Sequence, residues 1–197
     1  AKHPERINGR PLFLWHGTAD DKVPYELNKE FYEITKDLIY NPTILQMKKY
    51  KQHYDTDCYD HCLEVAYWSY LFCKKLNWDY ISVARAAVLH DLFLYDWRHS
   101  KKMLNGWHAF KHPQIALENA LKICNLNEKE QDIILKHMWP VTFFKFPKYK
   151  ESYVITITDK LSALKSFYEY YQSHLMKKKF LRYAYIFFAF SIFKLNI

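Results

Sequence analysis

Histidines and aspartates that could hold a metal ion occur at three separated places along the chain. His61 lies early in a helix-like segment, His90-Asp91 closes a strongly apolar one, and Asp159 follows a second apolar run. A carboxylate carried into a core is costly unless it is paired or bound to a cation. Imidazole and carboxylate groups suit a divalent transition metal, which can turn a water into a nucleophile. The sequence therefore predicts a buried metal site built from these four residues.

Helices are the elements expected to position these side chains. Residues 57–76 repeat small and apolar side chains at spacings of three and four, and residues 79–95 are apolar nearly all round, as in a central helix. The stripe of the first helix comprises Cys58, Cys62, Val65, Ala66, Ser69, Phe72, Cys73 and Leu76. With only 3 glycines, the chain suits an all-α fold better than a sheet-rich fold with many tight turns.

Later helices have recognisable starts. His112-Pro113 is typical of a helix start with proline at the first helical position. Asn127, followed three residues later by Glu130, indicates an N-cap for a helix that reaches about His137. Two prolines, Pro140 and Pro147, predict a loop, and a further helix is expected over 151–172.

The order His61, His90-Asp91, Asp159 resembles the H…HD…D signature of the HD superfamily of metal-dependent phosphohydrolases. The flanks are similar too, because an alanine-rich helix runs into the HD pair and Lys160 and a Leu-Ser-Ala run follow Asp159. The resemblance covers residues from about 45 to 172. It implies an all-α, HD-type helical bundle in which His61, His90, Asp91 and Asp159 bind one divalent metal ion.

Some branches of this superfamily bind a second metal through two further histidines between the HD pair and the last aspartate. His112 and His137 fall in that interval, each expected at a helix terminus. They resemble the extra ligands of cyclic-dinucleotide phosphodiesterases and diadenosine-tetraphosphate hydrolases, although the glycine-tyrosine-proline motif of the former is absent. We therefore expect one or two ions of iron, manganese, cobalt, nickel or zinc, and our hypothesis is a two-metal site bridged by Asp91.

Other side chains are candidates for contact with a substrate. Asp91 is a candidate catalytic residue. Lys160 and His108 are further candidates that could hold a phosphate or protonate the leaving group, and His53 is a candidate substrate-binding residue. For Lys160, His108 and His53, a structural or surface role is at least an equal alternative. Aromatic residues of the same region could stack on a nucleobase, although most are expected in the core: Tyr95, Trp97, Trp107, Phe110, Trp139, Phe143 and Phe144.

Residues 1–40 have a different texture and are expected to be a separate extension. An apolar strand over 11–15, a turn over 16–21 and a helix over 25–34 are predicted. Residues 11–24 resemble the HGxxDxxVP segment of an α/β-hydrolase, with Asp20 as the acid of a catalytic triad. No G-x-S-x-G nucleophile motif occurs in the sequence, so an esterase activity is not expected. The strand could pack on the helical domain or on a second copy, which leaves a homodimer open.

Residues 173–197 are a basic, aromatic tail that is expected to be helical. Its apolar part, 180–193, is shorter than the roughly 20 residues of a spanning helix, so a packed helix is favoured over an amphipathic anchor and no membrane span is expected. The polar start of the chain and four cysteines without a Cys-x-x-Cys pair predict a cytoplasmic protein without disulfides.

The leading interpretation is a phosphohydrolase in which metal-activated water cleaves a phosphate ester or anhydride of a nucleotide or similar small metabolite. The net charge of +8 is compatible with an anionic substrate, although a solvated lysine-rich surface is an equal explanation, and no stable nucleic-acid partner is expected. Two alternatives stay open: a non-catalytic HD module that senses a nucleotide, and an oxygenase of the HD type with two iron ions.

Overall fold

The computed structural model describes residues 6–7, 10–11, 25–54 and 56–194, with side chains between 28 and 174 apart from residues 55, 102 and 103. Within the extension, β1 (Arg6–Ile7) pairs antiparallel with β2 (Arg10–Pro11). The predicted strand beyond Pro11, the turn over 16–21 and Asp20 lie outside the described residues. Nearly all of the segment over 11–24 that resembles an α/β-hydrolase is therefore outside the described part of the chain.

Helices make up most of the described chain, which confirms the all-α prediction. In chain order they are α1 (Tyr25–Ile39), α2 (Pro42–Leu45), η2 (Gln46–Lys49), α3 (Cys58–Lys75), α4 (Tyr80–Leu89), η3 (Trp97–His99), α5 (Lys101–Leu104), α6 (His108–Leu121), α7 (Glu128–Lys136) and α8 (Lys150–Lys194). A short hairpin of β3 (Lys51–His53) and β4 (Thr56–Asp57) precedes α3. Across the described residues, no helix combines the length and apolar character that crossing a membrane requires.

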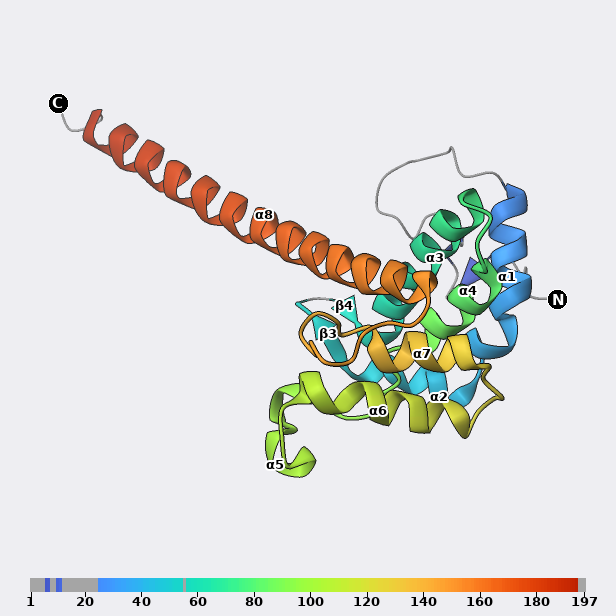
Figure 1. Ribbon diagram of the computed structural model, residues 1–197. Coiled ribbons are helices and arrows are strands. Elements are labelled where there is room, and N and C mark those ends of the chain that lie inside the picture. Colours follow the sequence, from blue (N-terminus) through green and yellow to red (C-terminus); the bar gives the residue numbers. More distant parts are fainter. Residues whose placement is uncertain (1–5, 8–9, 12–24, 55, 195–197) are drawn as a thin grey trace.

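Helix α4 occupies the centre of the bundle, with α1, α3, α7 and the first turns of α8 around it (Figure 1). Its side chains from Ser82 to Leu89 are buried apart from Arg85. Asp79 caps its start by accepting a hydrogen bond from the backbone N–H of Ser82 at 3.1 Å. A helix that is apolar nearly all round is stable only when surrounded in this way.

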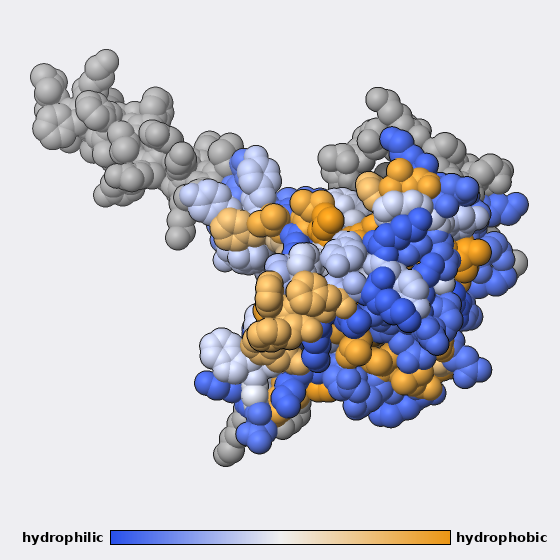
Figure 2. All heavy atoms as spheres, in the orientation of Figure 1, coloured by the Kyte–Doolittle hydropathy of each residue, from blue (hydrophilic) through white to orange (hydrophobic). Residues whose placement is uncertain are grey.

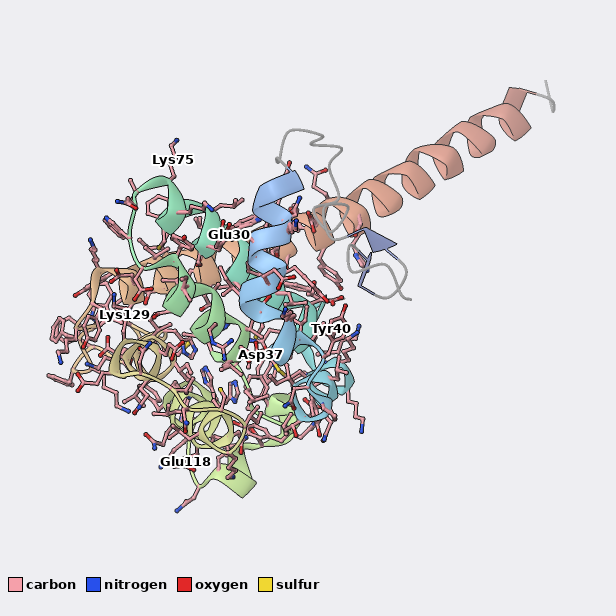
Figure 3. The ribbon with its side chains drawn as sticks, turned by 90° about the vertical axis from the view of Figure 1, so that its right-hand side faces the viewer. Glu30, Asp37, Tyr40, Lys75, Glu118 and Lys129 are labelled. Carbon is pink, nitrogen blue, oxygen red and sulfur yellow. The ribbon has the colours of Figure 1, made fainter. Side chains whose placement is uncertain are left out.

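Helix α1 belongs to the same bundle, on the side that faces the viewer in Figure 3. Its Asp37 forms two hydrogen bonds with the guanidinium of Arg85, at 2.8 and 2.9 Å. Its Glu30 accepts a hydrogen bond from the Tyr70 hydroxyl at 2.6 Å. Phe31 is buried in the core, so the helical part of the extension packs as an integral element.

Three local predictions were wrong. The helix expected over 79–95 ends at Leu89, because the chain turns at His90-Asp91 with turn hydrogen bonds such as Leu92 N–H to Leu89 O at 3.1 Å. Helix α6 begins at His108, one turn before the expected start at His112-Pro113, and contains Pro113. The helix tolerates that proline near its start, where only one intrahelical hydrogen bond is lost.

The third error concerns the stripe of α3. Phe72 and Leu76 are 50% and 42% exposed, whereas the other six residues of the stripe are buried. Phe72 lies in the last turn of α3 and Leu76 is its C-cap. The capping box at Asn127 and Glu130 is confirmed, with Asn127 Oδ1 2.9 Å from the N–H of Glu130 and Glu130 Oε2 2.8 Å from the N–H of Asn127.

Candidate metal centre

Five helices bring the six candidate ligands together. His61 lies in the N-terminal part of α3, His90 caps the C-terminus of α4 and is followed by Asp91, and Asp159 comes from α8. The side chains of His61, His90 and Asp91 are at most 3% exposed, and that of Asp159 is 13% exposed. Their ligand atoms lie within 4.8 Å of one another and form what we call the first cluster.

A second cluster contains Asp91, His112 from α6 and His137 from the C-cap of α7. All three side chains are buried, and their ligand atoms also lie within 4.8 Å of one another. Asp91 is common to both clusters. The six residues therefore form one continuous centre with two adjoining halves.

The two oxygens of Asp91 face different halves of this centre. Oδ2 lies 3.5 Å from His90 Nε2 and 3.9 Å from His61 Nε2, in the first cluster. Oδ1 lies 3.1 Å from His112 Nε2 and 3.4 Å from His137 Nε2, in the second cluster. This arrangement allows one carboxylate to bridge two cations.

Hydrogen bonds to the backbone set the tautomer of three histidines. The Nδ1 atoms of His90, His112 and His137 lie 2.7, 2.9 and 2.8 Å from the carbonyl oxygens of residues 87, 108 and 134. A carbonyl oxygen can only accept, so each Nδ1 carries a proton and donates. In the neutral ring Nε2 then presents a lone pair, which is the form that binds a metal.

The interatomic distances fit the edges of a coordination shell. His61 Nε2 and Asp159 Oδ1 are 3.0 Å apart, and His112 Nε2 and His137 Nε2 are 2.8 Å apart. Ligand atoms about 2.1 Å from one ion lie about 3 Å apart when their bonds meet at right angles. Among the side chains that the structure describes, buried His90 Nε2 and Asp91 Oδ1 make no hydrogen bond. A divalent cation in each half would satisfy these atoms.

Both carboxylates are held in the ionised state that metal binding needs. Burial alone would raise the pKa of Asp91, but His90 and His112 lower it well below its ordinary value. The pKa of Asp159 is likewise well below its ordinary value, because the neighbouring imidazoles of His61 and His90 outweigh the effect of burial. Neither group needs to lose a proton at neutral pH before a metal binds.

His61 differs from the other three histidines because neighbouring side chains, rather than a backbone carbonyl, orient its ring. The Ser162 hydroxyl donates to Glu64 Oε2 at 2.7 Å, and Ser162 Oγ lies 3.3 Å from His61 Nδ1, whose N–H it can accept. Lys165 pairs with Glu64 from one turn further along α8. These contacts join α3 to α8 and leave His61 Nε2 directed at Asp159 and Asp91.

A cavity of about 260 Å³ opens onto both clusters. The three further residues predicted to contact substrate all line it: His53, His108 and Lys160. Apolar side chains form much of the remaining wall: Trp97, Ala109, Met138, Val141 and Ala163. The centre can therefore receive a small molecule that combines an anionic group with an apolar part.

The expectation that most of the nearby aromatic residues belong to the core was wrong for four of them. Trp107, Phe110, Phe143 and Phe144 are 70%, 50%, 59% and 93% exposed. Large side chains from other helices, such as Tyr59 and Tyr70, already fill the core. Of the seven aromatic residues proposed for base stacking, Trp97 lines the cavity.

Sequence reasoning missed Gln52. Its Nε2 donates to Asp91 Oδ2 at 2.5 Å, its buried Oε1 has no partner among the described side chains, and it lines the cavity. Its position on β3, one residue before His53, is the only sequence signal that could have pointed to it. Ser162 and Glu64 were also missed, although Ser162 lies one helical turn from Asp159.

Comparisons with known proteins identify one family. A family model described as the HD domain matches residues 58–164, a range that contains all six candidate ligands. Curated proteins and solved structures give no match.

Proposed function

The chain belongs to the HD domain family, and from that premise we propose that it is a phosphohydrolase acting on a nucleotide or similar small phosphorylated metabolite. The reaction would be cleavage of a phosphate ester or anhydride bond by water. The observation that carries the proposal is Asp91, which presents one oxygen to each of two histidine-containing clusters. The six residues of these clusters would hold two divalent ions of iron, manganese, cobalt, nickel or zinc.

Bound divalent ions supply Lewis acidity toward a phosphoryl oxygen and lower the pKa of water toward neutrality. The protein's part is to hold the ligands in place and to orient the substrate. Gln52 fixes one oxygen of Asp91 by its amide N–H. The relay from Ser162 to Glu64 orients His61. The apolar side chains of Trp97 and Val141 line the cavity beside the clusters and could contact an apolar part of the substrate.

Lys160 is the side chain best placed to pair with a substrate phosphate. Its Nζ donates to the carbonyl oxygen of His137 at 3.1 Å and lies 3.8 Å from Asp159 Oδ2, at the cavity wall. Burial lowers the pKa of Lys160 while Asp159 and Asp91 oppose that effect. A phosphate in the cavity would add negative charge beside the ammonium and favour its protonated form.

His108 would act as a neutral hydrogen-bond donor. Burial, with a smaller effect of His112, lowers the pKa of His108 to about 4, so that its ring is neutral at neutral pH. The Tyr95 hydroxyl lies 3.0 Å from His108 Nδ1, and burial raises the pKa of Tyr95, so this hydroxyl keeps its proton and can donate it. The His108 proton then resides on Nε2, available to an oxygen of the substrate.

A turnover screen of the metal-loaded full chain tests this function. Mononucleotides, dinucleotides, cyclic dinucleotides and small phosphomonoesters would be compared, beside an Asp91→Ala variant as the control for contaminating phosphatases. We expect release of phosphate or a nucleotide from at least one class, abolished in the variant. Tight nucleotide binding without turnover would contradict the proposal and favour a non-catalytic sensing module.

A further inference from the structure

A regular stripe of exposed apolar side chains runs along α8. Ile157, Leu161, Leu164, Tyr168 and Tyr171 are between 48% and 62% exposed. Successive members are four, three, four and three residues apart. Beyond the bundle α8 continues as a single helix that projects from the rest of the molecule in both ribbon views (Figures 1 and 3). We call these five residues the α8 stripe.

The alternation of four and three is the spacing of the inner positions of a coiled coil. Side chains repeated every 3.5 residues form a narrow seam that fits another helix. The opposite face of this part of α8 packs against α3, whereas leucine and tyrosine side chains of the stripe are half exposed along one line, without the partner that normally covers such a seam. The stripe therefore indicates a helical partner.

Exposed aromatic residues extend this surface toward the bundle. Tyr153 precedes Ile157 by one helical turn and contacts Trp139, with ring centroids 5.5 Å apart. Trp139 contacts Phe146 at 6.2 Å, and Phe146 contacts Phe143 at 5.5 Å. Figure 2 shows apolar side chains gathered near the base of α8, where the loop between α7 and α8 lies. We call Phe143, Phe144 and Phe146 the aromatic loop; they are 59%, 93% and 52% exposed.

The combined surface is large enough for a stable interface. A large apolar side chain that is half exposed can bury about 100 Å² on contact. Eight such side chains, five from the α8 stripe and three from the aromatic loop, would bury about 800 Å² per partner. That is the size of a standard specific interface between two proteins.

We propose that a second copy of this chain docks on the α8 stripe and the aromatic loop to form a homodimer. The same stripe on each copy can supply both sides of the seam, as in an isologous dimer. The narrow seam fits a helix better than a membrane surface, which would need a broad apolar face. Lys165, which flanks the stripe, is paired with Glu64 and lies 4.0 Å from Glu169.

This inference goes beyond the proposed function, because assembly can be measured whether or not the chain hydrolyses a phosphate. Sedimentation velocity of the full chain over a wide concentration range is the test. We expect the mass of a dimer for the wild type, and weakening of association by about 100-fold for Leu164→Glu or Tyr171→Glu, as for central interface residues. Ser173→Glu, which adds the same charge to α8 outside the stripe, should leave association unchanged.

Two results would overturn the inference. The first is a wild type that stays monomeric at every concentration, or a Leu164→Glu variant that dimerises as the wild type does. The second is a monomeric wild type that cosediments with vesicles of phosphatidylglycerol and loses this binding in Phe144→Ala, which would assign the surface to an anionic membrane. Thermal unfolding of each variant under monomeric conditions separates loss of docking from loss of folding.

Discussion

The Nε2 atoms of His112 and His137 lie 2.8 Å apart, while each ring directs its Nδ1 toward a backbone carbonyl. Two rings held in this way direct their Nε2 atoms toward the same point. Asp91 Oδ1, 3.1 Å from His112 Nε2, adds a negative charge at the same point. The three atoms could together hold a cation. The second cluster is therefore suited to a metal ion.

Removing the metal should lower the stability of the whole bundle. Metal that binds only the folded chain at about 1,000 times its dissociation constant contributes about 4 kcal/mol. For a chain of this size that corresponds to a fall in Tm of about 10 °C. Thermal unfolding with and without a chelator measures the effect, and added metal should restore the original Tm. An unchanged Tm after verified metal removal would contradict this prediction.

Ser162→Ala should weaken metal binding in the first cluster only. The variant removes the hydroxyl that can accept the Nδ1 proton of His61, and loss of such a partner typically costs 10- to 100-fold in affinity. Competition with a metal indicator would resolve the two binding steps. Ser166→Ala, one turn further along α8, is the matched control. Equal weakening of both steps would show that Ser162 acts on general stability.

Gln52→Met should lower kcat/KM by about 10- to 100-fold while the metal content stays close to that of the wild type. Methionine preserves much of the volume of glutamine but cannot donate to Asp91 Oδ2. Gln52→Asn, which keeps a shorter amide, should recover part of the loss. Kinetics and metal analysis on the same preparations are required. Full activity of Gln52→Met would remove this residue from the site.

The sequence was sufficient to pick out the side chains that the structure brings together in the two clusters, but not the residues around them. His90-Asp91 and Asp159 stand out because charged or polar groups follow apolar runs, and His61 stands out as the histidine early in the preceding helix-like segment. Gln52 and Glu64 could not be found in this way. Their importance depends on contacts 39 and 98 residues away along the chain, with Asp91 and Ser162 respectively.

The difference between local sequence patterns and contacts between distant parts of the chain also explains the wrong predictions for the helix ends and for the aromatic residues. The sequence is apolar on both sides of His90-Asp91, so periodicity alone could not reveal the turn at Asp91. Phenylalanine is a residue type common in protein cores, yet Phe144 is 93% exposed, because burial depends on how the loop after α7 packs. The spacing of the α8 stripe was present in the sequence, yet only the structure shows that it is exposed.

Asp132 should make stability depend on pH. Its Oδ2 accepts hydrogen bonds from the N–H of Lys148 at 2.9 Å and from the Ser152 hydroxyl at 2.7 Å, and its Oδ1 pairs with Lys136. Burial opposes ionisation, but Lys136 and Ser152 prevail and lower the pKa of Asp132. A lowered folded-state pKa means that this stabilisation is complete above about pH 4, near the unfolded-state pKa, and is lost as the pH falls below it.

Asp132→Ala tests this role. Asp132 belongs to α7 and binds the start of α8 by hydrogen bonds, and α8 is the helix that carries Asp159. We expect a loss of about 2 kcal/mol at neutral pH, as for other buried hydrogen-bonded carboxylates. Chemical unfolding at several pH values should show that the difference from the wild type shrinks as the solution becomes acidic. A difference that is constant down to pH values below the folded-state pKa would contradict the assignment.

Metal content per chain tests the central claim most directly. It would be measured on the wild type, Asp91→Ala and His112→Ala after loading with one transition metal and removal of the excess. The bridging role of Asp91 predicts two ions in the wild type, one in His112→Ala and loss of both in Asp91→Ala. A single ion in the wild type that persists in His112→Ala would contradict the two-metal centre and leave His112 and His137 as structural residues.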